Sequence, residues 1–89
     1  MKIKDGFVLE EVGGSYIAVA VGERASTFSG LVRMNGTGAF LWNFMKDKDV
    51  SEEELLAAVL EAYEGVTSEM VEKDISAFVA KLRDGGILE

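Results

Sequence analysis

Carboxylates are the only abundant side chains in this sequence that could carry out acid–base chemistry. The 89 residues include 16 Asp and Glu but no His and no Cys, so the usual general base, the commonest metal ligand and any thiol nucleophile are missing. Two carboxylates that face each other across a cleft could act as acid and base. The densest group, residues 52–54, instead follows Ser51 at a predicted helix start, where negative charge is stabilised. We therefore predict that the chain is not an enzyme.

Two glycine-rich segments are candidates for a phosphate-binding loop. They are Gly13-Gly14 and residues 36–38, which read Gly-Thr-Gly. Neither has the spacing of a nucleotide-binding motif, and the second lacks the lysine of a P-loop. A hairpin turn explains the first segment and a helix start explains the second. Since no Asp-rich calcium loop is present either, the sequence predicts neither a metal nor a cofactor.

The charge of the chain opposes binding to nucleic acid. The formal net charge is −7, whereas such binding depends on Lys and Arg that neutralise phosphates. The last predicted helix carries three basic residues: Lys73, Lys81 and Arg83. The same helix carries four acidic residues: Glu69, Glu72, Asp74 and Asp84. It therefore offers no basic stripe, and we expect no nucleic-acid partner.

Length and composition favour one domain over residues 1–89. The sequence is 48% hydrophobic and 28% charged, as in ordinary globular proteins. No apolar stretch approaches the roughly 18 residues of a membrane-spanning helix. The first residues are not followed by the apolar run of a signal peptide. We expect a cytoplasmic protein without membrane contact.

The first third of the chain predicts a β-hairpin. Apolar runs at residues 7–12 and 16–21 flank Gly13, Gly14 and Ser15. A three-residue loop would place Leu9 opposite Val19 and Phe7 opposite Val21, whereas a two-residue loop would pair both with alanines. We favour the three-residue loop because it gathers the large apolar side chains on one face. A polar connection leads to a third, short strand at residues 31–34.

Helical periodicity begins after Thr37. Three helices are predicted, over residues 37–45, 51–63 and 67–85, and the second opens with a Ser51–Glu54 capping box. We expect a core formed by Trp42 in the first helix, Leu55, Leu56, Val59 and Leu60 in the second, and Val71, Ile75, Phe78, Val79 and Leu82 in the third, with Ile87 and Leu88 as a last apolar anchor. A three-stranded antiparallel sheet followed by three helices is an α+β fold, compatible with a winged helix-turn-helix.

The third strand would form an edge of the sheet if the strands follow sequence order. Its unpaired N–H and C=O groups are then available to another chain, and Arg33 is the only charge that protects it. A peptide could add there as a further strand. Alternatively, a loop covers this edge, or a second copy of the chain does so in a homodimer.

Several segments together resemble one family. They are residues 30–42 (Gly-Leu-Val-Arg-Met-Asn-Gly-Thr-Gly-Ala-Phe-Leu-Trp), the capping box at 51–54, residues 60–63 (Leu-Glu-Ala-Tyr), Asp74 and residues 82–88. In this order they resemble the PqqD family over nearly the whole chain. Met34 stands where leucine is more usual. We interpret Asn35 as a turn former and Trp42 as a core residue of the strand-to-helix corner.

The resemblance implies a winged helix-turn-helix domain of the kind called a RiPP recognition element. Such a domain binds the leader of a ribosomally made precursor peptide and presents it to a modifying enzyme, often a radical S-adenosylmethionine enzyme. The leader adds to the third strand, in a groove closed by the third helix. Carried onto this chain, the resemblance implies peptide contacts from Leu31, Val32, Arg33, Met34, Met70, Asp74, Phe78 and Lys81.

A fold does not fix a function. The alternative is a small winged-helix DNA-binding regulator, or a structural accessory protein, that uses the same domain.

Overall fold

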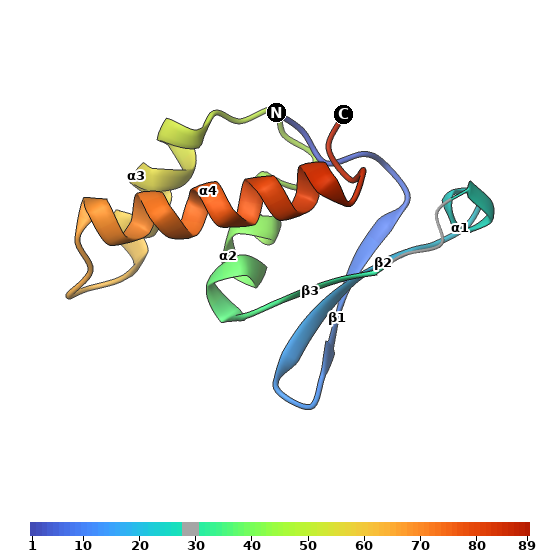
Figure 1. The fold of residues 1–89 in the computed structure, drawn as a ribbon, viewed down its shortest axis with the longest axis horizontal. Coiled ribbons are helices and arrows are strands. Elements are labelled where there is room, and N and C mark those ends of the chain that lie inside the picture. The colour runs from blue at the N-terminus through green and yellow to red at the C-terminus, as the bar shows by residue number, and fades with distance from the viewer. Residues whose placement is uncertain (28–30) are drawn as a thin grey trace.

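The computed structural model describes residues 1–27 and 31–89 (Figure 1). In these residues the elements are β1 (Phe7–Val12), β2 (Ser15–Ala20), α1 (Arg24–Thr27), β3 (Val32–Met34), α2 (Gly36–Met45), α3 (Glu52–Ala62) and α4 (Ser68–Asp84). The strands form an antiparallel sheet in the order β1-β2-β3, and helices α2 to α4 lie together on one side of it in Figure 1. The predicted α+β class is confirmed.

The predicted hairpin register is wrong. Val12 pairs with Ser15, so the turn consists of Gly13 and Gly14 alone, and Leu9 lies opposite Ala18 instead of Val19. The same shift places Phe7 opposite Ala20 instead of Val21. Both glycines have positive φ, 57° and 84°, as in a type I′ turn, whose twist matches that of the flanking strands.

The inner face of the sheet combines large and small side chains. Ala18 is only 1% exposed and lies between Leu9 on β1 and Val32 on β3. Because an alanine leaves room beside a leucine, the helices can approach this face closely. Side chains alternate along a strand, so Val8 and Val19, which pair with each other, lie on the opposite, outer face.

The helices cover the inner face with the residues that the periodicity predicts. Trp42 in α2 is 2% exposed. In α4 the whole predicted stripe is buried: Val71, Ile75, Phe78, Val79 and Leu82. Burial of these side chains is the main favourable contribution to folding.

Helix α3 confirms the predicted capping box. The Ser51 Oγ accepts a hydrogen bond from the Glu54 N–H at 3.2 Å, and the Glu54 Oε1 accepts one from the Ser51 N–H, also at 3.2 Å. The expectation that Leu60 is buried is wrong, because this side chain is 37% exposed. It lies about 140° around the helix from Leu55, whereas the buried stripe of α3 follows Leu55 and Val59.

One observed helix is not among the predicted elements. Helix α1 is a single turn within the predicted polar connection, and four residues are too few to show apolar periodicity. The rest of that connection, Phe28 to Gly30, lies outside the described residues.

The two ends of the chain are paired with each other. Ile3 and Leu88 form an isolated antiparallel bridge, and the Lys4 N–H donates to the Ile87 carbonyl at 2.8 Å. Ile87 is fully buried, which confirms the predicted anchor. Nearby, the Met1 ammonium donates a hydrogen bond to the Asp49 carboxylate at 2.7 Å and thereby holds the pKa of Asp49 below its ordinary value.

Among the described residues, no helix combines the length and apolar character that crossing a bilayer requires.

The hairpin turn gives the first testable prediction. Because Gly13 has the positive φ of a type I′ turn, Gly13→Asn should raise the free energy of unfolding by up to about 1 kcal/mol, since Asn tolerates this conformation and restricts the unfolded chain. Gly13→Val should lower it by about 1–2 kcal/mol, because a β-branched residue is strained there. Urea titration of both variants measures the difference. Equal destabilisation by Asn and Val would show that the turn is not of this type.

Candidate functional site

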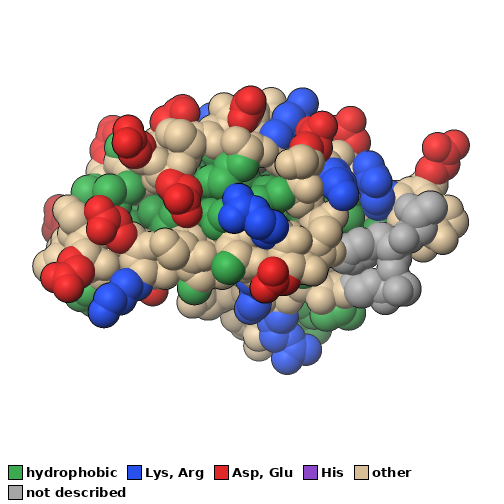
Figure 2. Space-filling view, turned by 45° about the horizontal axis from the view of Figure 1, so that its top comes forward, with side chains coloured by type: hydrophobic (Ala, Val, Ile, Leu, Met, Phe, Trp, Pro, Cys, Tyr) green, Lys and Arg blue, Asp and Glu red, His purple; other side chains and the backbone are tan. Residues whose placement is uncertain are grey.

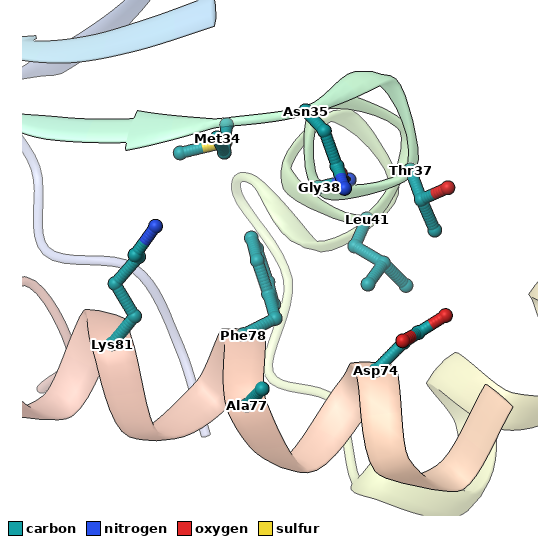
Figure 3. Close-up of a pocket in the computed structure, with 9 residues that line it drawn as sticks. All are labelled: Met34, Asn35, Thr37, Gly38, Leu41, Asp74, Ala77, Phe78 and Lys81. Carbon is teal, nitrogen blue, oxygen red and sulfur yellow. Dashed lines mark hydrogen bonds between the residues drawn. The ribbon is translucent and has the colours of Figure 1, made fainter. Parts of the chain in front are cut away.

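A cavity of about 180 Å³ lies where β3, the start of α2 and the middle of α4 meet. Its lining residues are Met34, Asn35, Thr37, Gly38, Leu41, Asp74, Ala77, Phe78 and Lys81. Figure 3 shows α4 as one wall, with the Phe78 and Lys81 side chains extending from it toward the β3 side. We call this hollow, together with the adjoining edge of β3, the groove.

The sheet register determines which backbone groups face the groove. The Val21 N–H donates to the Gly6 carbonyl at 2.8 Å, so this residue of the hairpin turns its backbone toward the β1 side. Neighbouring residues of an extended strand turn their backbone groups to opposite sides. Tyr16 and Ala18 therefore turn theirs away from β1 and toward β3.

The same alternation leaves one residue of β3 open. Met34 pairs with Tyr16, and Val32 pairs with Ala18, so the backbone groups of Met34 and Val32 bond to β2. The N–H and C=O of Arg33, which lies between them, point away from the sheet. Arg33 is thus the β3 residue that offers both a donor and an acceptor to an additional strand.

Lys81 of α4 covers part of this open edge. Its Nζ donates a hydrogen bond to the Arg33 carbonyl oxygen at 2.7 Å, across 48 positions of sequence. This contact agrees with the outward direction of the Arg33 carbonyl. A lysine placed beside an edge strand is a common means of discouraging unwanted strand pairing.

The floor of the groove is apolar. Phe78 is 7% exposed, Met34 is also 7% exposed and Leu41 is 1% exposed, and all three line the cavity. The phenyl ring of Phe78 stands between the α4 and β3 walls in Figure 3. An apolar side chain that enters the cavity would therefore be removed from water against carbon atoms.

Opposite charges stand at the two ends of this floor. Asp74 and Lys81 are exposed residues of α4, about 10.5 Å apart along the helix axis. Within residues 1–27 and 31–89, neither side chain has an oppositely charged partner within 4.0 Å. Figure 3 shows Asp74 on the Thr37 side of Phe78 and Lys81 on the other side.

The corner between β3 and α2 depends on Asn35 and Gly38. Asn35 is the N-cap of α2, and its Oδ1 accepts a hydrogen bond from the Gly38 N–H at 2.9 Å. A Cβ on Gly38 would lie 2.8 Å from the Met34 Cβ, so only glycine lets α2 lie this close to β3. The reading of Asn35 as a turn former is thus refined to a helix cap.

The eight site residues that the sequence predicts fall into three groups by their position in the structure. Met34, Asp74, Phe78 and Lys81 line the cavity, and Val32 and Arg33 lie on β3. Leu31 is 59% exposed and precedes the strand, and Met70 is 57% exposed and is not among the lining residues. The sequence does not assign the other five lining residues to the site: Asn35, Thr37, Gly38, Leu41 and Ala77.

The arrangement is suited to holding an extended chain. It offers the outward N–H of Arg33, a carbonyl of the same residue that Lys81 now covers, an apolar hollow and one charge of each sign. Among the described residues, no three His, Cys, Asp or Glu side chains lie together as a metal site would require.

The fold is that of an α+β domain whose three-stranded antiparallel sheet carries a layer of helices. A solved structure described as TbiB1 in complex with the TbiA(beta) leader peptide shares it: the TM-score is 0.71 and the identity 21%, over 100% of this chain and 95% of that chain. The family model for coenzyme PQQ synthesis protein D (PqqD) matches residues 8–88, so the chain belongs to the PqqD family. Comparison with curated proteins gave no significant match.

The corner gives the second prediction. Gly38→Ala should lower the free energy of unfolding by about 1–3 kcal/mol, because its new Cβ must push Met34 aside. Gly36→Ala is the matched control. Among the described residues, no atom beyond the adjacent residues and the backbone of α2 lies within 4 Å of the added Cβ, so stability should be unchanged or rise by up to about 1 kcal/mol. Urea unfolding of both variants measures the contrast, and similar behaviour would refute the close contact.

Proposed function

We propose that this protein binds the leader region of a ribosomally made precursor peptide by strand addition to β3 and presents it to a modifying enzyme. The observation that carries the proposal is the outward-facing backbone of Arg33 beside an apolar cavity. Free strand edges are recognition sites for extended peptides, because main-chain hydrogen bonds supply affinity and adjacent pockets supply specificity.

The peptide would run antiparallel to β3. In an antiparallel pair, one residue exchanges both of its backbone hydrogen bonds with a single partner residue. Arg33 alone can therefore anchor the peptide through two bonds, which suits a strand of only three residues. Flanking contacts would come from Leu31, Val32 and Met34.

Helix α4 would form the other wall of the binding site. Phe78 supplies the apolar pocket, and Asp74 and Lys81 supply charge. Met70 lies one turn before Asp74 with 57% of its surface exposed, so it would touch a peptide that extends past the cavity.

Family and fold support the same function. The chain belongs to the PqqD family, and the solved structure that shares its fold was determined with a leader peptide. We therefore propose that the chain acts as a RiPP recognition element with a winged helix-turn-helix architecture. It would deliver the peptide to a partner enzyme, which we propose to be a radical S-adenosylmethionine enzyme, and would itself act by binding alone.

DNA binding by the same domain is disfavoured by charge. The net charge is −7, and Figure 2 shows acidic side chains interspersed with basic ones over the face it displays, with no continuous basic stripe there. Neutralisation of several phosphates requires such a stripe.

A proline at the open edge gives the third prediction. Arg33→Pro removes the outward N–H but no β2 ladder bond, so affinity for the leader peptide of the precursor encoded nearest to this gene should fall at least roughly tenfold. Fluorescence anisotropy with the labelled peptide measures it.

Arg33→Ala is the matched control for this variant. It keeps the backbone donor and removes the same side chain, so its affinity should stay within about threefold of the original, since an exposed charge contributes little. Tight binding by the proline variant would show that the peptide binds elsewhere.

A further inference from the structure

We infer that the groove reads the order of charges along the added strand: a cationic, an apolar and an anionic side chain at alternate positions, from N- to C-terminus. This inference rests on the proposed strand addition to β3. It specifies the chemistry of the segment that the site selects.

The register of the added strand determines which peptide side chains enter the groove. Arg33 is exposed, whereas Val32 and Met34 are buried on the inner face. Directly opposed residues of paired strands share a face. The peptide residue opposite Arg33 therefore points outward, and those opposite Met34 and Val32 point inward, toward α4.

The central inward position meets the apolar floor. The residue opposite Met34 lies over the cavity that Phe78 and Leu41 line. Both side chains are buried, and among the residues that the structure describes, Asp74 and Lys81 are the charged ones that line the hollow. An aliphatic side chain fits this position.

The Lys81 end requires an anion. The ammonium of Lys81 donates a hydrogen bond to the Arg33 carbonyl oxygen at 2.7 Å. The same oxygen is the acceptor for an N–H of the added peptide strand, so the ammonium has to share this acceptor or move toward another one. A carboxylate on the inward residue opposite Val32 would receive it, since the C-terminal end of α4 lies by Val32: a Cβ on Gly85 would be 3.1 Å from a Val32 methyl group.

The Asp74 end requires a cation. Asp74 lies on the side of the cavity where α2 begins, next to Thr37 and Leu41. In antiparallel addition, the inward residue two positions before the apolar one lies beyond the end of β3, on the side where α2 begins. A Lys or Arg there can reach the carboxylate.

The spacing of the three groove side chains along α4 is close to the spacing of alternate residues along the added strand. Asp74, Phe78 and Lys81 span about 10.5 Å along α4, and three alternate residues of a strand span about 13.6 Å. The flexible ends of the lysine and of the partner side chains cover the difference. Antiparallel addition then fixes the order as cationic, apolar, anionic.

Two synthetic peptides of identical composition separate charge order from net charge. One contains Lys-Thr-Leu-Thr-Glu and the other Glu-Thr-Leu-Thr-Lys, between the same uncharged flanks and with the same fluorophore. The protein should bind the first roughly threefold to tenfold more tightly, as two exposed charge pairs allow. The double variant Asp74→Lys, Lys81→Glu should prefer the second peptide by a similar factor. Both positions are exposed, and thermal unfolding checks that the variant folds.

Other outcomes overturn the inference. Equal affinities for the two peptides, or the same preference in protein and variant, mean that charge order is not read at Asp74 and Lys81. Failure to bind either peptide while the leader peptide binds also overturns it and leaves the proposed function intact. If the leader peptide does not bind either, both the inference and the proposed function are overturned.

Discussion

The two-residue turn at Gly13 and Gly14 sets the pairing of β1 with β2, and thereby which backbone groups of β2 face β3. With Val12 paired to Ser15, the inner face receives Leu9 and Ala18. A one-residue change of register would exchange the inner and outer faces of a strand. The same alternation continues through β2 and, together with the pairing of Met34 with Tyr16, leaves Arg33 with its N–H and C=O directed outward.

The groove follows from this constraint together with the packing of two helices. Gly38 lets α2 approach Met34, and α4 lies across the inner face with Phe78 beneath the end of β3. Lys81 then reaches the Arg33 carbonyl. The edge of β3 therefore has backbone groups that can pair with another strand, and a lysine that shields part of them. Such an edge can discourage pairing with unrelated strands and still bind a matching peptide.

The sequence predicts the helices well because their signals are local and strong. The Ser51–Glu54 capping box and the buried stripe of α4 follow from side chains three or four residues apart. The hairpin register does not follow in this way, because two glycines and a serine allow either loop length. The predicted pairing of large residues with large ones is wrong, since Leu9 pairs with Ala18, whose small side chain leaves room for it on the inner face.

The groove itself depends on contacts between distant parts of the chain. The resemblance to a family indicates β3 and the last helix, and four of the residues it implies line the cavity. Which of the β3 residues offers its backbone depends on the register, and the Lys81 contact joins positions 48 residues apart. The role of Gly38 requires the position of Met34, which no local pattern provides.

Hydrogen exchange at the Arg33 amide tests the central claim most directly. In the free protein this amide should exchange much faster than those of Val32 and Met34, which bond to β2. Saturating leader peptide should slow it at least roughly tenfold, because the N–H becomes bonded to the added strand. An Arg33 amide that exchanges as slowly as its neighbours without peptide, or that is unaffected by bound peptide, would contradict the account.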